Sequence, residues 1–244
     1  MEHKLYETYR KIEAEHWWFV GRQAILANIL RKYFPPKAKI LDIGCNTGVL
    51  VGILQKNGYE AFGSDMSQEA IEYGSQRGVK KLYVATGEKQ PFPDQTFDCV
   101  MALDVIEHID DDGAVIKEMK RLLKPDGKII IKVPAFMFLW GLQDEAAHHK
   151  RRYTKNSLSK IITSEGFSII RETYFNTFLF IPILISRLIQ KIMPPKRTSD
   201  FDLNNRFINA VLRKIFIAEA FLLRYIDFPF GVSFLAVASK KHEE

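Results

Sequence analysis

The residues best suited to acid–base chemistry lie in one short basic stretch, "HHKRRYT", residues 148–154. The imidazole of His149 can take a proton from a hydroxyl group near neutral pH. Arg151 and Arg152 suit a phosphate or carboxylate on the molecule that carries this hydroxyl. We therefore expect His149 and Tyr153 to be catalytic and the two arginines to bind substrate. A basic loop with a structural histidine is the alternative that the residues leave open.

A second polar group follows the apolar run 97–103 and consists of Asp104, Glu107 and His108. Glu107 and His108 are the second choice for the catalytic base. The D-x-x-E-H spacing is not specific for a metal site, and carboxylates are favoured at the start of a helix. We interpret the group as a helix start and expect no metal.

A glycine-containing loop, "LDIGCNTG" at 41–48, follows the first apolar run. It lacks the G-x-G-x-x-G spacing that binds a dinucleotide, which argues against a nicotinamide-dependent dehydrogenase. Gly44 and Gly48 let the backbone approach a ligand, and the next helix presents N–H groups there. Asp65 follows Gly44 by 21 residues, and a carboxylate there can bind ribose hydroxyls. The loop and Asp65 together predict a nucleoside site.

The elements that must position these groups form an alternating pattern from Lys39 onward. Short β-branched runs alternate with helical patterns, which predicts βαβ units and a parallel sheet. Thr154 is the expected N-cap of the helix that follows the basic stretch. The expected strands cover 39–44, 60–65, 81–86, 97–103, 128–134, 167–175 and 231–240, with a turn "KPDG" at 124–127 before the fifth.

Two segments lie outside this pattern. Helices at about 4–15 and 22–33 precede Pro35-Pro36, and we assign residues 1–36 to an N-terminal helical cap. Residues 176–229 are not needed to complete the sheet and are interpreted as a helical insertion. The expected core is therefore 37–175 together with 230–241.

The ordered motifs resemble those of the class I S-adenosylmethionine-dependent methyltransferases. The first motif of that family, D-x-G-x-G-x-G, is matched by Asp42, Gly44, Asn46 and Gly48, and its second acidic residue by Asp65. "PFPDQTFDCVMALDVIEHI" and "LLKPDGKIII" are similar to the segments around its fourth and fifth strands. The resemblance implies a three-layer Rossmann-like fold with a seven-stranded, mostly parallel sheet and an antiparallel last strand.

The same resemblance implies S-adenosylmethionine as cofactor. Asn46 replaces the middle glycine of the motif and would need a positive φ, which asparagine tolerates. Thr86 stands where the family carries an acidic residue near the adenine. The expected cofactor-binding residues are Asp42, Gly44, Asn46, Gly48, Asp65, Met66, Thr86, Gly87, Leu103, Arg22 and Trp18.

Arg22 and Trp18 come from "EAEHWWFVGRQ", which resembles the N-terminal signature of a bacterial subfamily linked to glycan or lipid-carrier modification. Arg22 could clamp the cofactor carboxylate and Trp18 could cover the site. A helix packed by two tryptophans with a surface arginine is the alternative. "HHKRRYT" is similar to the H-x-R-R-Y stretch of the same subfamily.

Charge and cysteine content indicate the kind of partner and the cellular compartment. Residues 1–150 carry 20 Lys/Arg and 21 Asp/Glu, whereas residues 151–244 carry 15 and 8, so the second part is basic. That suits an anionic substrate or surface, although a solvated basic face is equally consistent. Two cysteines and an N-terminus without an apolar signal core predict a cytoplasmic protein. A peripheral position at the inner face of the membrane is a second possibility.

We expect methyl transfer to an oxygen of a sugar, a lipid-linked glycan or a hydrophobic small molecule. A non-catalytic cofactor-binding regulatory or partner protein is the alternative from another class. RNA methylation fits the basic second half but lacks an appended RNA-binding motif. DNA is not an expected partner, because "ALDVIE" stands where base-methylating enzymes carry Asn/Asp-Pro-Pro-aromatic.

The insertion has the apolar content of a surface-binding element. Its longest charge-free run, 173–186, has 14 residues, fewer than the roughly 20 that a membrane span needs. Apolar residues of 207–215 share a helical face, with arginines and lysines beside them. We expect either contact with an anionic membrane surface or packing on the sheet or on a second subunit as a homodimer.

Overall fold

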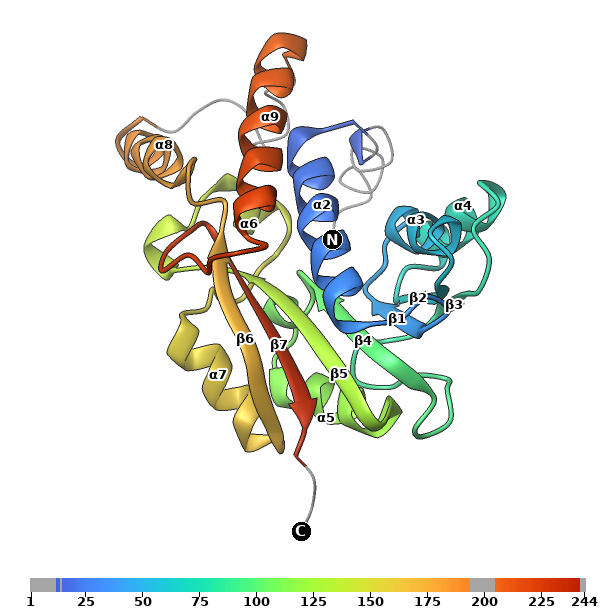
Figure 1. The fold of residues 1–244 in the computed structure, drawn as a ribbon. Helices are drawn as coiled ribbons and strands as arrows, with labels where there is room; N and C mark the ends of the chain where they lie inside the picture. Colours follow the sequence, from blue (N-terminus) through green and yellow to red (C-terminus); the bar gives the residue numbers. More distant parts are fainter. Residues whose placement is uncertain (1–11, 14, 194–204, 242–244) are drawn as a thin grey trace. The chain divides into compact units, whose positions relative to one another are not determined.

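The computed structural model describes residues 12–13, 15–193 and 205–241 (Figure 1). The chain divides into two compact units. Unit 1 combines Met1–Lys32, Pro134–Tyr153 and Thr173–Phe234, and unit 2 combines Tyr33–Val133, Thr154–Glu172 and Leu235–Glu244. The predicted division into cap, core and insertion stays a prediction. Most of the expected first helix, at about 4–15, lies outside the described residues.

Unit 2 is built on a seven-stranded sheet in the order β3-β2-β1-β4-β5-β7-β6. The last residues of β5 and β6 and the first of β7 extend into unit 1. Pairing among β1 to β5 is parallel, and β7 is antiparallel, as predicted. The strands are β1 Lys39–Ile43, β2 Glu60–Asp65, β3 Leu82–Val84, β4 Phe97–Leu103, β5 Leu123–Pro134, β6 Phe167–Phe175 and β7 Ser233–Lys240.

The central strands are apolar because both of their faces are covered. Residues from Ile40 to Ile43 are at most 3% exposed, and β4 is nearly as well buried. Continuous apolar runs of this kind are typical of parallel strands buried on two sides. The first, second, fourth and sixth strands begin and end where the sequence predicts, to within one residue.

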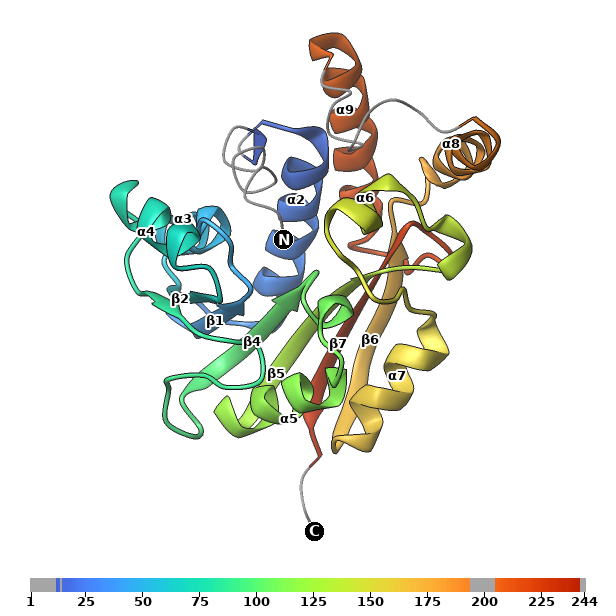
Figure 2. The same cartoon turned by 180° about the vertical axis from the view of Figure 1, so that it is seen from behind.

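The helices of unit 2 begin at local capping residues. Ser67 accepts the N–H of Ala70, and Thr154 accepts that of Ser157, which confirms the predicted N-cap. α5 and α7 contact each other on one face of the sheet (Figure 2). The helices are α3 Val49–Lys56, α4 Gln68–Gln76, α5 Asp112–Leu122 and α7 Lys155–Ser164, with a single 3-10 turn, η1, at Ile106–His108.

Unit 1 contains helices and an aromatic cluster. The rings of Trp17, Trp18, Phe175 and Phe216 lie with centroids 5.5–6.1 Å apart. A Cβ at Gly21 would lie 2.2 Å from the Phe216 ring, so only glycine fits there without repacking. None of the described helices is long and apolar enough to cross a membrane. The elements are α2 Trp17–Tyr33, η2 Met137–Leu139, α6 Leu142–Ala146, α8 Phe180–Ile192 and α9 Arg206–Leu222.

Several predicted boundaries are wrong, among them the start of the last strand, because β7 begins at Ser233 rather than at residue 231. α2 begins at Trp17 rather than near residue 22. β3 is only three residues long, because the chain beyond Val84 leaves the sheet. The expected turn "KPDG" lies inside β5, where Phe97 pairs with Leu123 but Cys99 pairs with Lys128. The extra residues on β5 form an irregularity of the bulge kind, which keeps both ends of the strand in register with β4.

Candidate cofactor and acceptor groups

The loop after β1 has a backbone that few residue types can adopt. Gly44, Asn46 and Gly48 have φ of 71°, 52° and 72°. The positive φ expected of Asn46 is confirmed. A Cβ on Gly44 would lie 2.4 Å from Cγ2 of Val105, so a larger residue is excluded by space as well as by backbone angle. Gly44 is therefore required both by its positive φ and by the closeness of Val105, and Gly48 is favoured by its positive φ.

Asp65 joins this loop to the end of β2. One carboxylate oxygen accepts the N–H of Asn46 and the other that of Ser67, each at 2.9 Å. Burial raises the pKa of Asp65, and the backbone hydrogen bonds oppose that shift. Each oxygen of a carboxylate has more than one acceptor position. Asp65 can therefore accept ribose hydroxyls while it holds the loop.

The loop also contains a buried acceptor suited to a ligand. The Oδ1 atom of Asn46 is buried and has no hydrogen-bond partner among the residues that the structure describes. A buried polar atom of this kind ordinarily has a partner. A ligand that brings N–H or O–H donors, as the amino acid part or the ribose of S-adenosylmethionine does, would supply one. The acceptor atoms of Asn46 and Asp65 thus fit the hydrogen-bond donors of the expected cofactor.

The remaining predicted cofactor residues of unit 2 lie at or just beyond the carboxyl ends of β1, β2, β3 and β4. Carboxyl ends of parallel strands share one edge of a sheet, where ligands bind. Met66 is 74% exposed, Thr86 is exposed and Leu103 is buried. A Cβ on Gly87 would lie 2.9 Å from the Ile109 side chain. Asp42, near the end of β1, is 3% exposed. Their roles as cofactor ligands stay predictions.

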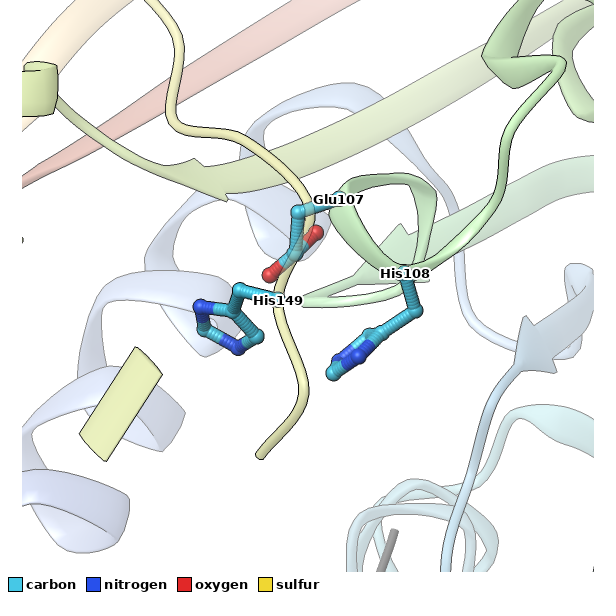
Figure 3. Close-up of side chains that lie close together, drawn as sticks. All are labelled: Glu107, His108 and His149. Atoms are coloured by element: carbon cyan, nitrogen blue, oxygen red, sulfur yellow. The ribbon is translucent and has the colours of Figure 1, made fainter. Parts of the chain in front are cut away.

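The turn after β4 holds an unusual carboxyl group, that of Glu107 (Figure 3). Its side chain is fully buried on η1. Burial raises the pKa of Glu107 well above its usual value, and the nearby Asp104 carboxylate raises it further, although Lys132 opposes the shift. The buried Lys132 forms an ion pair with the partly exposed Asp104. This shift favours the neutral form of Glu107 over the charged form that a carboxylate base needs.

In unit 1, the basic stretch is organised by a residue that sequence reasoning missed, Asp144. Its buried carboxylate contacts Nδ1 of His149 at 2.8 Å and accepts from Nε of Arg152 at 2.8 Å and from the N–H of Gly141 at 2.8 Å. Burial alone would raise the pKa of Asp144, but the His149 hydrogen bond and the Arg152 charge outweigh it and lower the pKa to about 2. Nothing in the local pattern "DEAAHH" marks this aspartate as special.

The two arginines of this stretch occupy different positions. Arg152 has a side chain only 6% exposed, and its guanidinium also donates to the carbonyl of Ala135 at 2.7 Å. Arg151 is half-buried. Tyr153 is 2% exposed and pairs its backbone with Pro134 and Phe136. Arg152 and Tyr153 thus fasten the stretch to the chain after β5, whereas the position of Arg151 suits a ligand better.

The N-terminal candidates lie on α2. Trp18 is half-buried and belongs to the aromatic cluster with Phe175 and Phe216. The Arg22 guanidinium carbon lies 5.3 Å from the centre of the Phe19 ring. These contacts agree with the alternative interpretation of the sequence, in which tryptophans pack the helix. The cofactor roles of both residues stay predictions.

Comparison with known proteins agrees with this fold and loop. Residues 41–131 match the family described as a methyltransferase domain. An uncharacterized protein of Methanocaldococcus jannaschii is 31% identical over 160 residues, which cover 65% of this chain and 75% of that protein. The ubiquinone biosynthesis O-methyltransferase of Idiomarina loihiensis is 25% identical over 166 residues. That match covers 59% of this chain and 66% of the enzyme, just under two thirds of its length.

Solved structures show the same architecture. A methyltransferase of Thermotoga maritima that depends on S-adenosylmethionine matches with a TM-score of 0.60 at 19% identity, covering 99% of this chain and 100% of that one. Fold, loop and family match together define a methyl-transferring enzyme. The chain belongs to the class I S-adenosylmethionine-dependent methyltransferases, and its methyl donor is S-adenosylmethionine.

Proposed function

We propose that this chain methylates an oxygen of a hydrophobic small molecule or a lipid-linked glycan, with His149 as the base. The observation that carries the proposal is the contact between His149 and the buried carboxylate of Asp144. An ionised carboxylate only accepts hydrogen bonds, so Nδ1 of His149 must be the protonated nitrogen. Nε2 then carries the lone pair that can take a proton from an acceptor hydroxyl.

These residues need only orient the acceptor and remove its proton. The cofactor supplies a methyl group already activated by its sulfonium. Orientation of the acceptor contributes most of the rate enhancement, and removal of its proton adds about 10²–10⁴-fold. Asp144 holds the imidazole in one tautomer and would stabilise the positive charge that His149 gains. Arg152 holds Asp144, and Arg151 would meet a phosphate or carboxylate on the acceptor.

Burial and charge favour His149 over the other candidate bases. Burial and the Asp104 carboxylate raise the pKa of Glu107, which disfavours the charged form that a carboxylate base needs. Tyr153 is buried with its backbone paired. His108 is half-buried on η1 (Figure 3) and stays the second choice.

Oxygen as the methylated atom is supported by the names of relatives. Several matching proteins, among them that of Idiomarina loihiensis, are called ubiquinone biosynthesis O-methyltransferases. They match this chain at 25–33% identity. Identity at this level does not carry the acceptor over to this chain, so the acceptor is our proposal. The subfamily indicated by "HWWFVGR" is a further proposal and points to a lipid-carrier or glycan acceptor.

The test uses labelled methyl donor and bacterial lipid and glycan extracts. We expect His149→Ala to lower transfer by about 10²–10⁴-fold while the cofactor dissociation constant stays nearly unchanged, because a base acts in the transition state. Asp144→Asn should also lower transfer, because an amide can stabilise the wrong tautomer. His148→Ala, an exposed neighbour, is the matched control. A parallel fall in cofactor affinity and transfer would contradict the proposal and move the base to His108.

A further inference from the structure

α8 has its apolar face on the outside. Five aliphatic residues are each more than half exposed, from 51% to 81%: Ile181, Ile185, Leu188, Ile189 and Ile192. At 100° per residue they fall within about 100° of arc on the helix. A helix that packed this face on its own protein would bury these residues.

One charged residue of α8, Arg187, is turned inward instead. Arg187 is 8% exposed and donates to Gln190 at 3.0 Å. Its side chain also lies against Gly141, where an added Cβ would stand 2.7 Å from the Arg187 Cδ atom. Arginine is rarely buried unless it is paired. Arg187 is thus directed inward, whereas the five aliphatic residues are directed outward.

α9 also exposes apolar residues, and positive charges accompany them. Phe207 is 76% exposed, and Phe221 and Tyr225 are 52% and 73% exposed. Within the described parts of 177–230, the exposed ionised residues are five cations and one anion, Asp227; the other acid, Glu219, is buried and accepts backbone N–H groups of 176–178. The exposed cations are Lys191, Arg206, Arg213, Lys214 and Arg224.

From this combination we infer that the outward face of α8, together with the exposed apolar residues of α9, lies in the headgroup region of an anionic lipid membrane. Aliphatic and aromatic side chains enter the boundary between headgroups and acyl chains, and flanking cations meet anionic headgroups. A second copy of the chain fits less well, because a two-fold contact would bring the same cationic surfaces together. The inference does not depend on the proposed acceptor.

Vesicle flotation of the full chain tests this inference. We expect co-flotation with phosphatidylglycerol vesicles and little with phosphatidylcholine vesicles. Raising salt from about 0.1 M to about 1 M should weaken binding, because the Debye length falls from about 10 Å to about 3 Å. The double variant Ile185→Asp, Ile189→Asp should reduce binding by at least about tenfold, since two inserted aliphatic side chains become charges.

The matched control is Ile170→Asp, which makes the same change at a residue of β6 that is 40% exposed. It should float like the wild type. Cofactor affinity of all three proteins checks that they are folded, so a failure here is separate from a failure of the methyl-transfer proposal. Absence of flotation with anionic vesicles would overturn the inference. So would equal flotation of the double variant, or loss of a dimer in sedimentation without any lipid binding.

Discussion

The carboxylate of Asp65 accepts the N–H groups of Asn46 and Ser67, and Asp65 is also the residue predicted to bind the ribose. Replacement by alanine should therefore remove ribose acceptors and loosen the loop. We expect Asp65→Ala to lose about 1.5–3 kcal/mol of cofactor binding, the range for hydrogen bonds to a charged group. Calorimetry with S-adenosylmethionine measures it.

Glu69→Ala is the control, since this exposed acid lies four residues further along on α4. It should bind the cofactor like the wild type. Equal affinity of Asp65→Ala and wild type would show that the ribose is bound elsewhere.

The candidate site could be predicted in part from single residues. The glycines, Asp65 and His149 are predicted from residue type and neighbouring sequence alone: glycine for a close backbone approach, aspartate for ribose hydroxyls and histidine for proton transfer. Asp144 is not, because its importance comes from three donors that the fold brings to it. The raised pKa of Glu107 also depends on burial and on Asp104, with Lys132 opposing it, and no spacing in the sequence reveals these neighbours.

The start of α2 depends on a buried histidine. His16 is 4% exposed, and its Nδ1 accepts the N–H of Trp18 at 3.3 Å. Burial lowers the pKa of His16 from 6.5 to about 4. Between these values the unfolded chain binds a proton that the folded chain does not, so stability falls as pH drops from 6.5 to 4. Below pH 4 the accumulated loss is at most about 3 kcal/mol.

The variant His16→Asn checks this pH dependence. Its side-chain oxygen can still accept the Trp18 N–H, but it does not titrate. In urea unfolding between pH 7 and pH 4, we expect the variant to lose less stability than the wild type. Parallel curves for the two proteins would show that His16 is not the titrating group.

Among the elements, strands were easier to predict than helix starts. Strands buried on both faces are marked by their own apolar runs, as in β1, β2 and β4. The N–H of Trp17, the first residue of α2, is instead accepted by Asn209 at 2.7 Å. A cap supplied from 192 residues away leaves no local signal. Which face of α8 is exposed could not be predicted either, because a helical period places apolar residues on one face without saying whether that face is buried.

Asn209 connects distant parts of unit 1 in both directions. Its side chain accepts the Trp17 N–H and donates to the carbonyl of Glu15 at 3.0 Å. We expect Asn209→Ala to lower the free energy of unfolding by about 1–2 kcal/mol, because two hydrogen bonds are lost at a partly exposed position. Chemical denaturation followed by tryptophan fluorescence measures this change.

The exposed neighbour Ala210→Gly is a suitable comparison on α9. It should cost less than about 1 kcal/mol, the difference in helix propensity. Hydrogen exchange at Trp17 should rise in Asn209→Ala and stay unchanged in Ala210→Gly. If neither variant alters exchange at Trp17, the cap does not stabilise the start of α2.

The discontinuity of unit 1 also bears on how the protein is made. Residues near 17 and 209 must both exist before the cap on α2 can form, and the Trp18 ring must wait for Phe216. A ribosome adds about 5–20 residues per second, so roughly 10–40 s separate the two. During that interval the tryptophans of α2 are exposed on the nascent chain without their later neighbours. Unit 1 therefore cannot complete its aromatic cluster until α9 has been synthesised.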